Sequence, residues 1–374
     1  MRNYIVLVSK DHYNPLGIVR TLGEAGKNPI VIVVKGRLRL TAKSRYVKIK
    51  HYVANTEEGI KLLLSKYANA NEKSFILTGD DVTVSVLDAH YDELKDYFYF
   101  YNAGKQGCVR KYLDKTEMFA LAEQCGFKVP RTWRVKTGDI PADIDYPIIT
   151  KAINSFGKEW KEIVYICRNE SELKKAFEGI NSESVLIQQY IDKVDEQGCE
   201  GFSVNQGKDS FFSVWNSEVY HLPGKYAPYW KNSNVDDKQF IEKAAAMIAG
   251  IHFEGIFEFE FIVDKSGELY FLEINLRNTV NGWSTTVAGM PSAVLWCESM
   301  IRGEIDKGYY KKIPEGFTTM AECFDYDARV KTGIISHKEW MKQYRSVNAK
   351  LYRGRKDYFP FLYFMLYKLF KMKH

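Results

Sequence analysis

The sequence predicts an α/β protein that begins with a parallel sheet and continues into an α+β region with antiparallel strands. Near the N-terminus, short runs of β-branched apolar residues alternate with helical patterns, which is typical of parallel strands. Further along, apolar and polar residues alternate with a period of two, which indicates strands with one buried face. The 374 residues are 45% hydrophobic and 27% charged, a composition typical of folded domains, of which this length predicts two or three.

The first 105 residues predict a small parallel α/β domain. Strands are expected at residues 4–9 and 30–34, separated by a helix at 16–25. A second helix at 56–67 and a third strand at 75–78 follow. This part of the chain has no GxGxxG motif, so the sequence does not predict a Rossmann-type dinucleotide site.

The middle of the chain predicts alternating helices and short strands. A helix begins at Asp114 and ends at Gly126, because these residues suit a helix cap and a helix stop. The remaining elements are an extended segment at 127–135, strands at 146–152, 163–167 and 185–191, a helix at 171–177, antiparallel strands at 202–204, 211–214 and 219–222, and a helix at 236–249.

A hairpin at residues 257–274 is the most informative segment. Its two strands are joined by Asp-Lys-Ser-Gly, a strong turn signal. Glu258 and Glu260 share one face of the first strand, while Glu273, Asn275 and Arg277 share one face of the second. Oxygen ligands suit Mg²⁺, and a guanidinium beside them suits a phosphate. We interpret the hairpin as a metal–phosphate site; the alternative is an ordinary solvated strand face.

Two lysines upstream of the hairpin support that interpretation. Lys151 ends an apolar strand, and Lys115 lies in the first turn of the helix that begins at Asp114, where an anion is favoured. A lysine at a strand end is usually only solvated, so each lysine alone is weak evidence. Their order along the chain is the order expected of a phosphate-binding set.

Together these segments resemble the ATP-grasp superfamily of carboxylate–amine ligases over residues 105–300. The resemblance is carried by Asp114-Lys115, by the segments FKVP, YPIITK and VLIQQYI, and above all by EFIVDKSGELYFLEINLR. Within the superfamily, the chain length and the HLPGKYAPYW segment are similar to the D-aspartate ligase-like branch, which is associated with cell-envelope polysaccharide or peptidoglycan.

The resemblance implies a domain order along the chain. Residues 1–105 would form a pre-ATP-grasp parallel α/β domain, and residues 106–190 the small ATP-grasp subdomain with a linker helix. Residues 191–349 would form the large subdomain with the metal site. Residues 350–374 would form a basic and aromatic tail that contains an amphipathic helix.

The resemblance also implies roles for individual residues. Lys115 and Lys151 correspond to the lysines that bind ATP phosphates, and residues 154–161 to the loop that closes over them. Arg277 corresponds to the arginine that steadies the transferred phosphoryl group. The Mg²⁺ or Mn²⁺ ligands correspond to Glu260, Glu273 and Asn275. The hinge that binds adenine through its backbone corresponds to Gln189, Tyr190 and Ile191. The carboxylate that binds ribose corresponds to either Glu196 or Glu200.

Other residues near these motifs have two readings. Gln188 occupies a position where an acid is common, which weakens any role of its side chain. Lys225, a candidate catalytic residue, and His221 lie between the hinge and the metal strands, where they contact substrate or phosphate or are part of a solvated loop. The segment after Arg277 lies near the acceptor substrate or is a plain loop; its candidates are Asn281, Trp283 and Ser284.

The implied function is ATP- and Mg²⁺-dependent formation of an amide bond through an acyl phosphate, on a cell-envelope precursor such as one of peptidoglycan or capsule. The partners would be a carboxylate and an amine substrate, one of them lipid-linked. One alternative keeps this chemistry with a soluble amino acid and forms a dipeptide. Another alternative is a non-catalytic, nucleotide-binding adaptor at the membrane. The oligomeric state stays open.

The distribution of charge limits the partners. Residues 350–374 contain seven basic residues and one acidic residue, while the rest of the chain has 46 of each. A neutral body argues against a nucleic-acid binder. The six cysteines are far apart in the sequence, so we expect no zinc site or disulfide framework, and a cytoplasmic location.

The tail predicts an interfacial helix. Residues 358–367 are uncharged and rich in aromatic side chains, and basic residues flank them. No run of eighteen apolar residues occurs, so a spanning helix is not expected. We expect residues 357–373 to lie on the anionic inner face of the cytoplasmic membrane. The alternative is a helix that packs its aromatic side chains on the body of the protein or on a second subunit.

Overall fold

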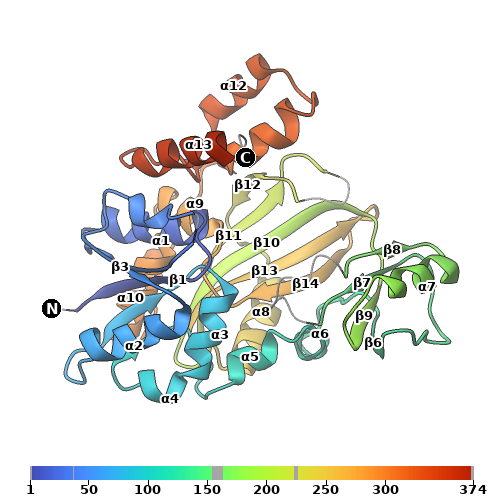
Figure 1. Ribbon diagram of the computed structural model, residues 1–374, viewed down its shortest axis with the longest axis horizontal. Coiled ribbons are helices and arrows are strands. Elements are labelled where there is room, and N and C mark those ends of the chain that lie inside the picture. Colours follow the sequence, from blue (N-terminus) through green and yellow to red (C-terminus); the bar gives the residue numbers. More distant parts are fainter. Residues whose placement is uncertain (1, 37, 154–162, 223–225, 372–374) are drawn as a thin grey trace.

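The computed structural model describes residues 2–36, 38–153, 163–222 and 226–371, and they form three sheets with flanking helices (Figure 1). The N-terminal sheet and the small sheet lie at opposite ends of the molecule, and the large sheet runs between them. This arrangement confirms the predicted fold class. It also places the carboxyl edge of the N-terminal sheet beside the large sheet.

The N-terminal sheet is parallel, with strand order β3-β2-β1-β4-β5. Alternate residues of β1 pack on opposite faces: Val6 and Val8 contact the core that includes α1, while Ile5 and Leu7 contact the core that includes α2. Burial on both faces explains the continuous apolar runs in the sequence. The elements are β1 (Tyr4–Val8), α1 (Tyr13–Glu24), β2 (Ile30–Val34), β3 (Ile49–Val53), α2 (Thr56–Tyr67), β4 (Ser74–Leu77), α3 (Asp81–Ala89), α4 (Tyr91–Leu94) and β5 (Phe98–Tyr99).

The small sheet has four strands in the order β6-β9-β7-β8. Ile148, Leu173 and Ile187 form its core, with one face covered by α7. Two helices, α5 (Cys108–Tyr112) and α6 (Lys115–Gln124), connect the N-terminal domain to this sheet. The other elements are β6 (Thr132–Lys136), β7 (Ile148–Lys151), β8 (Ile166–Cys167), α7 (Glu170–Glu178) and β9 (Ser184–Gln189).

The large sheet has seven strands in the order β14-β13-β10-β11-β12-β15-β16. The predicted hairpin is β13 and β14, and its phenylalanines pack against α8, with the Phe240 and Phe261 rings 5.7 Å apart. The elements are β10 (Lys193–Val204), β11 (Asp209–Glu218), β12 (Tyr229–Ser233), α8 (Lys238–Ile251), β13 (Gly255–Asp264), β14 (Leu269–Asn275), α9 (Asn281–Val287), α10 (Ser292–Arg302), β15 (Thr318–Met320) and β16 (Ala349–Lys350).

Two strand predictions in this region differ from the structure, one in where the strand begins and one in whether a strand is present. The strand expected at 202–204 is the end of β10, which begins nine residues earlier at Lys193; its charged first half resembles a loop in the sequence. Residues 219–221 are not in a strand. Val219 and Tyr220 instead pack against the C-terminal helices, and the strand that pairs with β11 is β12.

The C-terminal region forms a helical unit on the edge of the N-terminal domain. It contains α11 (Glu322–Asp325), a π-helical turn at Tyr326–Val330, α12 (His337–Ser346) and α13 (Phe359–Lys371). The predicted tail helix is therefore present. One of its faces packs on the protein, since the Phe364 ring stacks on Tyr352 with centroids 4.4 Å apart.

A buried ion pair fastens this unit to the N-terminal domain. Arg20 on α1 is fully buried, and its Nε lies 3.0 Å from Oδ2 of Asp357, just before α13. The same guanidinium donates to the carbonyl oxygens of Leu351 and Tyr352, both at 2.6 Å. Ser44 also donates to Asp357, at 2.9 Å. The position of α13 thus depends on residues more than 300 positions away in the chain.

Replacing Asp357 with alanine is expected to lower the free energy of unfolding by about 3–5 kcal/mol, because Arg20 would stay buried without its counter-charge. The measurement is urea unfolding followed by circular dichroism. The control is Asp306→Ala, which removes a half-exposed ion pair with Arg302 and should cost less than about 1 kcal/mol. Equal losses in the two variants would show that the Arg20 pair does not anchor the tail.

Candidate active site

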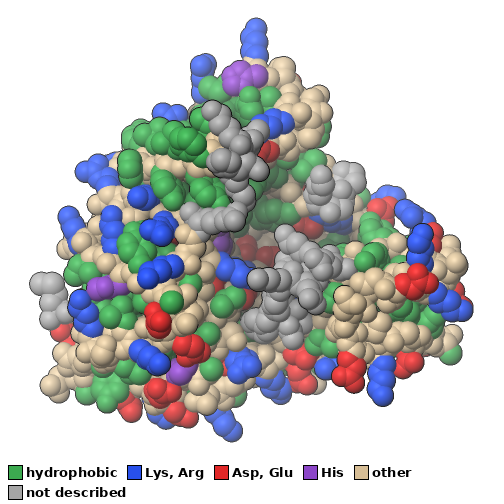
Figure 2. All heavy atoms as spheres, viewed as in Figure 1, with side chains coloured by type: hydrophobic (Ala, Val, Ile, Leu, Met, Phe, Trp, Pro, Cys, Tyr) green, Lys and Arg blue, Asp and Glu red, His purple; other side chains and the backbone are tan. Residues whose placement is uncertain are grey.

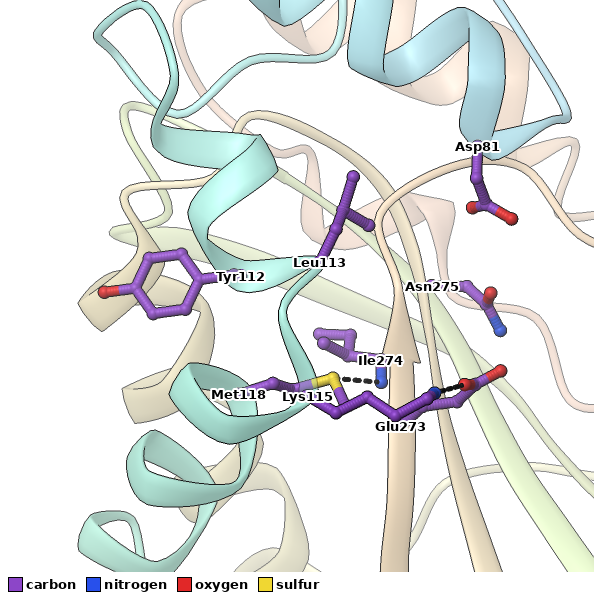
Figure 3. A pocket seen from close by; sticks show the side chains of 8 residues that line it. All are labelled: Asp81, Tyr112, Leu113, Lys115, Met118, Glu273, Ile274 and Asn275. Atoms are coloured by element: carbon purple, nitrogen blue, oxygen red, sulfur yellow. Dashed lines mark hydrogen bonds and ion pairs between the residues drawn. The ribbon is translucent and has the colours of Figure 1, made fainter. Parts of the chain in front are cut away.

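The inner part of the site lies where β13, β14, α6 and α3 meet (Figure 3). Glu260 on β13 stands directly opposite Glu273 on β14. Lys115 in the first turn of α6 reaches Glu273, with Nζ 2.8 Å from Oε2. The Asn275 amide donates to Glu260 at 2.6 Å. The structure therefore brings together four residues that are separated by up to 160 positions in the sequence.

Arg277 is held by a residue of the N-terminal domain. Its Nε and Nη2 donate to the two carboxylate oxygens of Asp81 at 2.6 and 3.1 Å, and Nη2 also donates to Oδ1 of Asn275 at 2.8 Å. Asp81 begins α3, and Asp80 caps that helix. A two-pronged pair of this kind fixes the plane of the guanidinium as well as its position.

Sequence reasoning did not identify Asp81 as a site residue. The available signal is the Gly79-Asp80-Asp81 segment after an apolar strand, because the carboxyl ends of parallel strands form the usual ligand-binding edge of such sheets. The sequence alone does not show that this edge meets the segment just after β14, which carries Arg277.

The electrostatics of the inner site favour a bound cation. Burial, reinforced by the negative charges of Glu273 and Glu258, raises the pKa of Glu260 well above its usual range. The ammonium of Lys115 lowers the pKa of Glu273. Two adjacent carboxylates in a partly buried site repel each other unless a proton or a metal ion lies between them.

The donor set fits a hard divalent ion. Within the described part of the chain, no group of three or more His, Cys, Asp or Glu side chains is arranged to hold a metal. The candidate ligands are two carboxylates, from Glu260 and Glu273, and the amide oxygen of Asn275. Mg²⁺ is commonly held by one or two carboxylates together with substrate phosphates and water, so this smaller set is sufficient.

A larger cleft of about 600 Å³ lies between the small sheet and the hairpin. Val164 and Ile166 line one side and are 42% and 39% exposed, and Ile262 and Leu272 from β13 and β14 also line the cleft. Apolar side chains from two sheets that line one cleft suit a flat, largely apolar group such as a nucleobase.

Lys151 extends into this cleft and is oriented by Gln188. Lys151 donates to Oε1 of Gln188 at 2.7 Å, and Gln188 Nε2 donates to Thr132 Oγ1 at 2.8 Å. Burial, with some contribution from Lys115, lowers the pKa of Lys151 to about 8. The expectation that the Gln188 side chain has little role is wrong. Its amide oxygen accepts the hydrogen bond that positions Lys151, and because the amide is neutral it leaves the charge of the lysine uncompensated.

The predicted hinge residues Gln189, Tyr190 and Ile191 all line the cleft. The N–H groups of Gln189 and Tyr190 already donate to the carbonyl oxygens of Arg131 and Pro147, at 2.8 and 3.0 Å. Among the residues that the structure describes, the N–H of Ile191 has no backbone acceptor. Ile191 is therefore the hinge donor best placed to bind a ligand.

Of the two candidates for the ribose hydroxyls, Glu196 lines the cleft and forms an ion pair with Lys193. Glu200 does not. It is fully buried and accepts hydrogen bonds from Thr279 and Ser292 at 3.0 and 3.1 Å. The structure contradicts the prediction for Glu200, because four residues along a strand carry it about 13 Å beyond Glu196.

The remaining candidates are placed as follows. His221 lines the cleft. Asn281 is buried and donates to Glu258, while Ser284 donates to the Asn281 carbonyl at 2.7 Å. Trp283 donates to the Lys350 carbonyl at 3.1 Å. The side chains of these three α9 residues therefore bind other parts of the protein and do not line the cleft. Lys225 and the loop at 154–161 lie outside the described residues.

Comparisons with known proteins agree with this geometry. Residues 114–295 match the family described as carbamoyl-phosphate synthase L chain, ATP binding domain. The N5-carboxyaminoimidazole ribonucleotide synthase of Staphylococcus epidermidis is 26% identical over 136 residues, which are 36% of this chain and 35% of that protein. The chain thus aligns with about a third of the length of this curated relative.

Solved structures share the fold. The L-amino acid ligase of Bacillus licheniformis superposes with a TM-score of 0.63 at 13% identity, covering 85% of this chain and 79% of that one. The biotin carboxylase domain of 2-oxoglutarate carboxylase from Hydrogenobacter thermophilus gives a TM-score of 0.63 at 18% identity, covering 85% and 74%. These findings support the resemblance to the ATP-grasp superfamily: residues 114–295, a little under half of the chain, match this ATP-binding domain family, and the chain shares the fold of the solved structures.

Proposed function

We propose that the protein is an ATP- and Mg²⁺-dependent carboxylate–amine ligase. The observation that carries this proposal is the inner site, where two facing carboxylates, an asparagine, a lysine and a clamped arginine meet at the end of a nucleotide-sized cleft. The matched family is an ATP-binding domain, and the Hydrogenobacter carboxylase structure is a complex with MgADP. Both support ATP and Mg²⁺ as cofactors.

The chemistry explains why such a site is needed. Bound ATP supplies the phosphoryl group that converts a carboxylate, a poor electrophile, into an acyl phosphate, which an amine attacks with loss of phosphate. The protein has only to position the reactants and balance their charge. Lys115 and Lys151 neutralise phosphate oxygens, and Glu260, Glu273 and Asn275 hold the metal ion. Arg277, fixed by Asp81, presents its guanidinium to the transferred group.

The substrate class is a separate proposal. We propose a cell-envelope precursor as one substrate, because the chain has an apolar and basic C-terminal helix. The alternative, a soluble amino acid, is favoured by the structural similarity to an L-amino acid ligase. A non-catalytic adaptor is disfavoured, since Lys115, Lys151, Glu260, Glu273, Asn275 and Arg277 all stand in the cleft or at its inner end.

Nucleotide affinity provides the first test. Gln188→Leu removes the acceptor that orients Lys151 and should weaken ADP binding about tenfold, the effect of one hydrogen bond to a charged group. Lys151→Met should weaken it further. Isothermal titration with ADP and Mg²⁺ is the measurement. Lys265→Met is the matched control, because Lys265 lines the same cleft but is exposed and paired with Asp192. Equal effects in the three variants would contradict the assigned role of Lys151.

Catalysis is tested by phosphate release from ATP and Mg²⁺ with a panel of carboxylates and amines. Turnover should require both a carboxylate and an amine. Glu273→Gln should reduce it by at least about 100-fold, the loss typical of one group that stabilises the transition state. Glu268→Gln, on the exposed turn of the same hairpin, should stay within twofold of the unsubstituted protein. Nucleotide binding without turnover against any pair would favour the adaptor.

We also propose that α13 contacts the inner face of the cytoplasmic membrane. It carries an apolar stripe, here the α13 stripe, whose members are 46–63% exposed: Phe359, Leu362, Met365, Leu366, Leu369 and Phe370. Hydrophobic side chains gather over α13 in Figure 2, and Lys and Arg side chains lie on its flank. No described helix combines the length and the hydropathy needed to cross a bilayer. Exposed apolar rows of this size mark interaction surfaces.

Membrane contact is tested by flotation with phosphatidylglycerol vesicles. Deleting the tail is unsuitable because Asp357 holds Arg20, so we choose Leu362→Glu combined with Leu366→Glu. The double variant should bind vesicles at least about tenfold more weakly, since each leucine contributes about 1.5–3 kcal/mol when buried. Ile301→Glu, which is equally exposed on α10, is the control. Unchanged flotation of the double variant would contradict the membrane proposal.

A further inference from the structure

A second cavity, remote from the inner site, lies between α12, α13 and the π-helical turn. It has a volume of about 420 Å³ and mostly apolar walls. Trp340, Met341 and Tyr344 of α12 line one side, and Met365 and Leu369 of α13 line another. We refer to it as the α12–α13 groove. Its volume is within the range of sites that bind small molecules in other proteins.

The polar atoms of the groove are already engaged. The Trp340 indole N–H donates to Asp325 Oδ2 at 2.7 Å, and the Tyr344 hydroxyl accepts from Arg353 at 3.2 Å. The groove therefore offers a ligand hydrocarbon and aromatic surface and few free hydrogen-bonding groups. An apolar surface of this kind is poorly suited to ordered water.

The groove opens onto the α13 stripe. Met365 and Leu369 line the groove and are also 46% and 54% exposed members of the stripe. The apolar surface of the stripe is therefore continuous with the interior of the groove. Leu362 and Leu366 belong to the stripe but do not line the groove. This difference separates contact with the surface from entry into the groove.

Three basic side chains line the groove beside the carboxylates of Asp327 and Glu322. Lys331 and Lys368 both pair with Asp327. Arg353 is exposed at the same rim, and among the residues that the structure describes it has no carboxylate partner. Arg355 and Lys356 follow in the chain and are also exposed. An apolar groove with a cationic rim matches a hydrocarbon chain that ends in an anionic head group.

We propose that the α12–α13 groove binds one acyl chain of an anionic membrane phospholipid, whose head group lies beside Arg353. This inference rests on the proposed membrane contact of α13, but not on the ligase activity. Binding would withdraw one chain from the bilayer and hold α13 in a fixed orientation on it. A chain held in the groove lies against the Trp340 ring.

The test uses lysophosphatidylglycerol, a single-chain anionic lipid, at concentrations below its aggregation threshold. Monomer binding by isothermal titration does not require a membrane surface, so failure of the membrane contact and failure of the groove are distinguishable. Leu369→Glu places a charge in the groove and should weaken binding at least tenfold. Leu366→Glu, which is equally exposed but outside the groove, should bind within twofold of the unsubstituted protein. Lysophosphatidylcholine should bind more weakly, for lack of net charge.

Fluorescence provides a second readout. Vesicles of phosphatidylglycerol with brominated acyl chains should quench tryptophan emission, and the quenched component should be absent in Trp340→Phe. Equal effects of Leu366→Glu and Leu369→Glu on monomer binding, or quenching that persists in Trp340→Phe, would overturn the proposal. A concentration-dependent dimer that Leu369→Glu abolishes, with no lipid binding, would assign the groove to a second copy of the chain and would equally overturn it.

Discussion

The ion pair between Arg277 and Asp81 is the contact on which the site depends. It joins the hairpin, which carries the candidate metal ligands, to the edge of the N-terminal sheet. Without Asp81, the hydrogen bond to Asn275 would be the one side-chain hydrogen bond left to Arg277 among the described residues, beside the carboxylates of Glu260 and Glu273. The N-terminal domain is therefore part of the site, because it places the carboxylate of Asp81 opposite the guanidinium of Arg277.

A second set of interdomain contacts lies behind the first. Arg20 binds Asp357 and also lies over the Trp283 ring at 5.6 Å. Trp283 is on α9, and two residues earlier on that helix Asn281 donates to Glu258 beside the inner site. The C-terminal unit and the site thus share one supporting helix. These contacts are a structural connection, and a variant at Asp357 can disturb activity without touching substrate.

The sequence was most informative where a strict period of two was tied to a tight turn. Within the two strands the hairpin has the predicted faces, and Glu260 and Glu273 are opposed, but β14 ends at Asn275 and Arg277 lies beyond it. Spacing could not choose between Glu196 and Glu200, because both lie on the same face of β10. Only contacts with distant residues, Thr279 and Ser292, distinguish the second. Nor could it reveal Asp81, since its partner lies 196 residues away. Local patterns determine faces, whereas contacts between domains depend on the assembled fold.

Tertiary contacts also account for the two differences from prediction in the large sheet. The charged start of β10 lacks an apolar pattern because Asp195 and Glu196 face partners within the protein, the Glu218 backbone and Lys193. The apolar residues Val219 and Tyr220 suggested a strand, but they pack on the C-terminal unit, where Tyr220 donates to Asp325 at 2.7 Å. In both places tertiary contacts outweigh the local preference.

The pairing of charges in the structure bears on how the proposed ligands bind. Lys115 is paired with Glu273, and Arg277 with Asp81 and Asn275. A metal ion at Glu273 would compete with Lys115 for the same carboxylate and release the ammonium toward a phosphate. When a metal–nucleotide complex binds, the metal ion would therefore replace Lys115 at Glu273, and a phosphate would replace Glu273 at Lys115. This exchange of partners leaves few charges in the site uncompensated. This exchange predicts that metal and nucleotide each bind weakly alone and tightly together, whichever carboxylate and amine the proposed ligase joins.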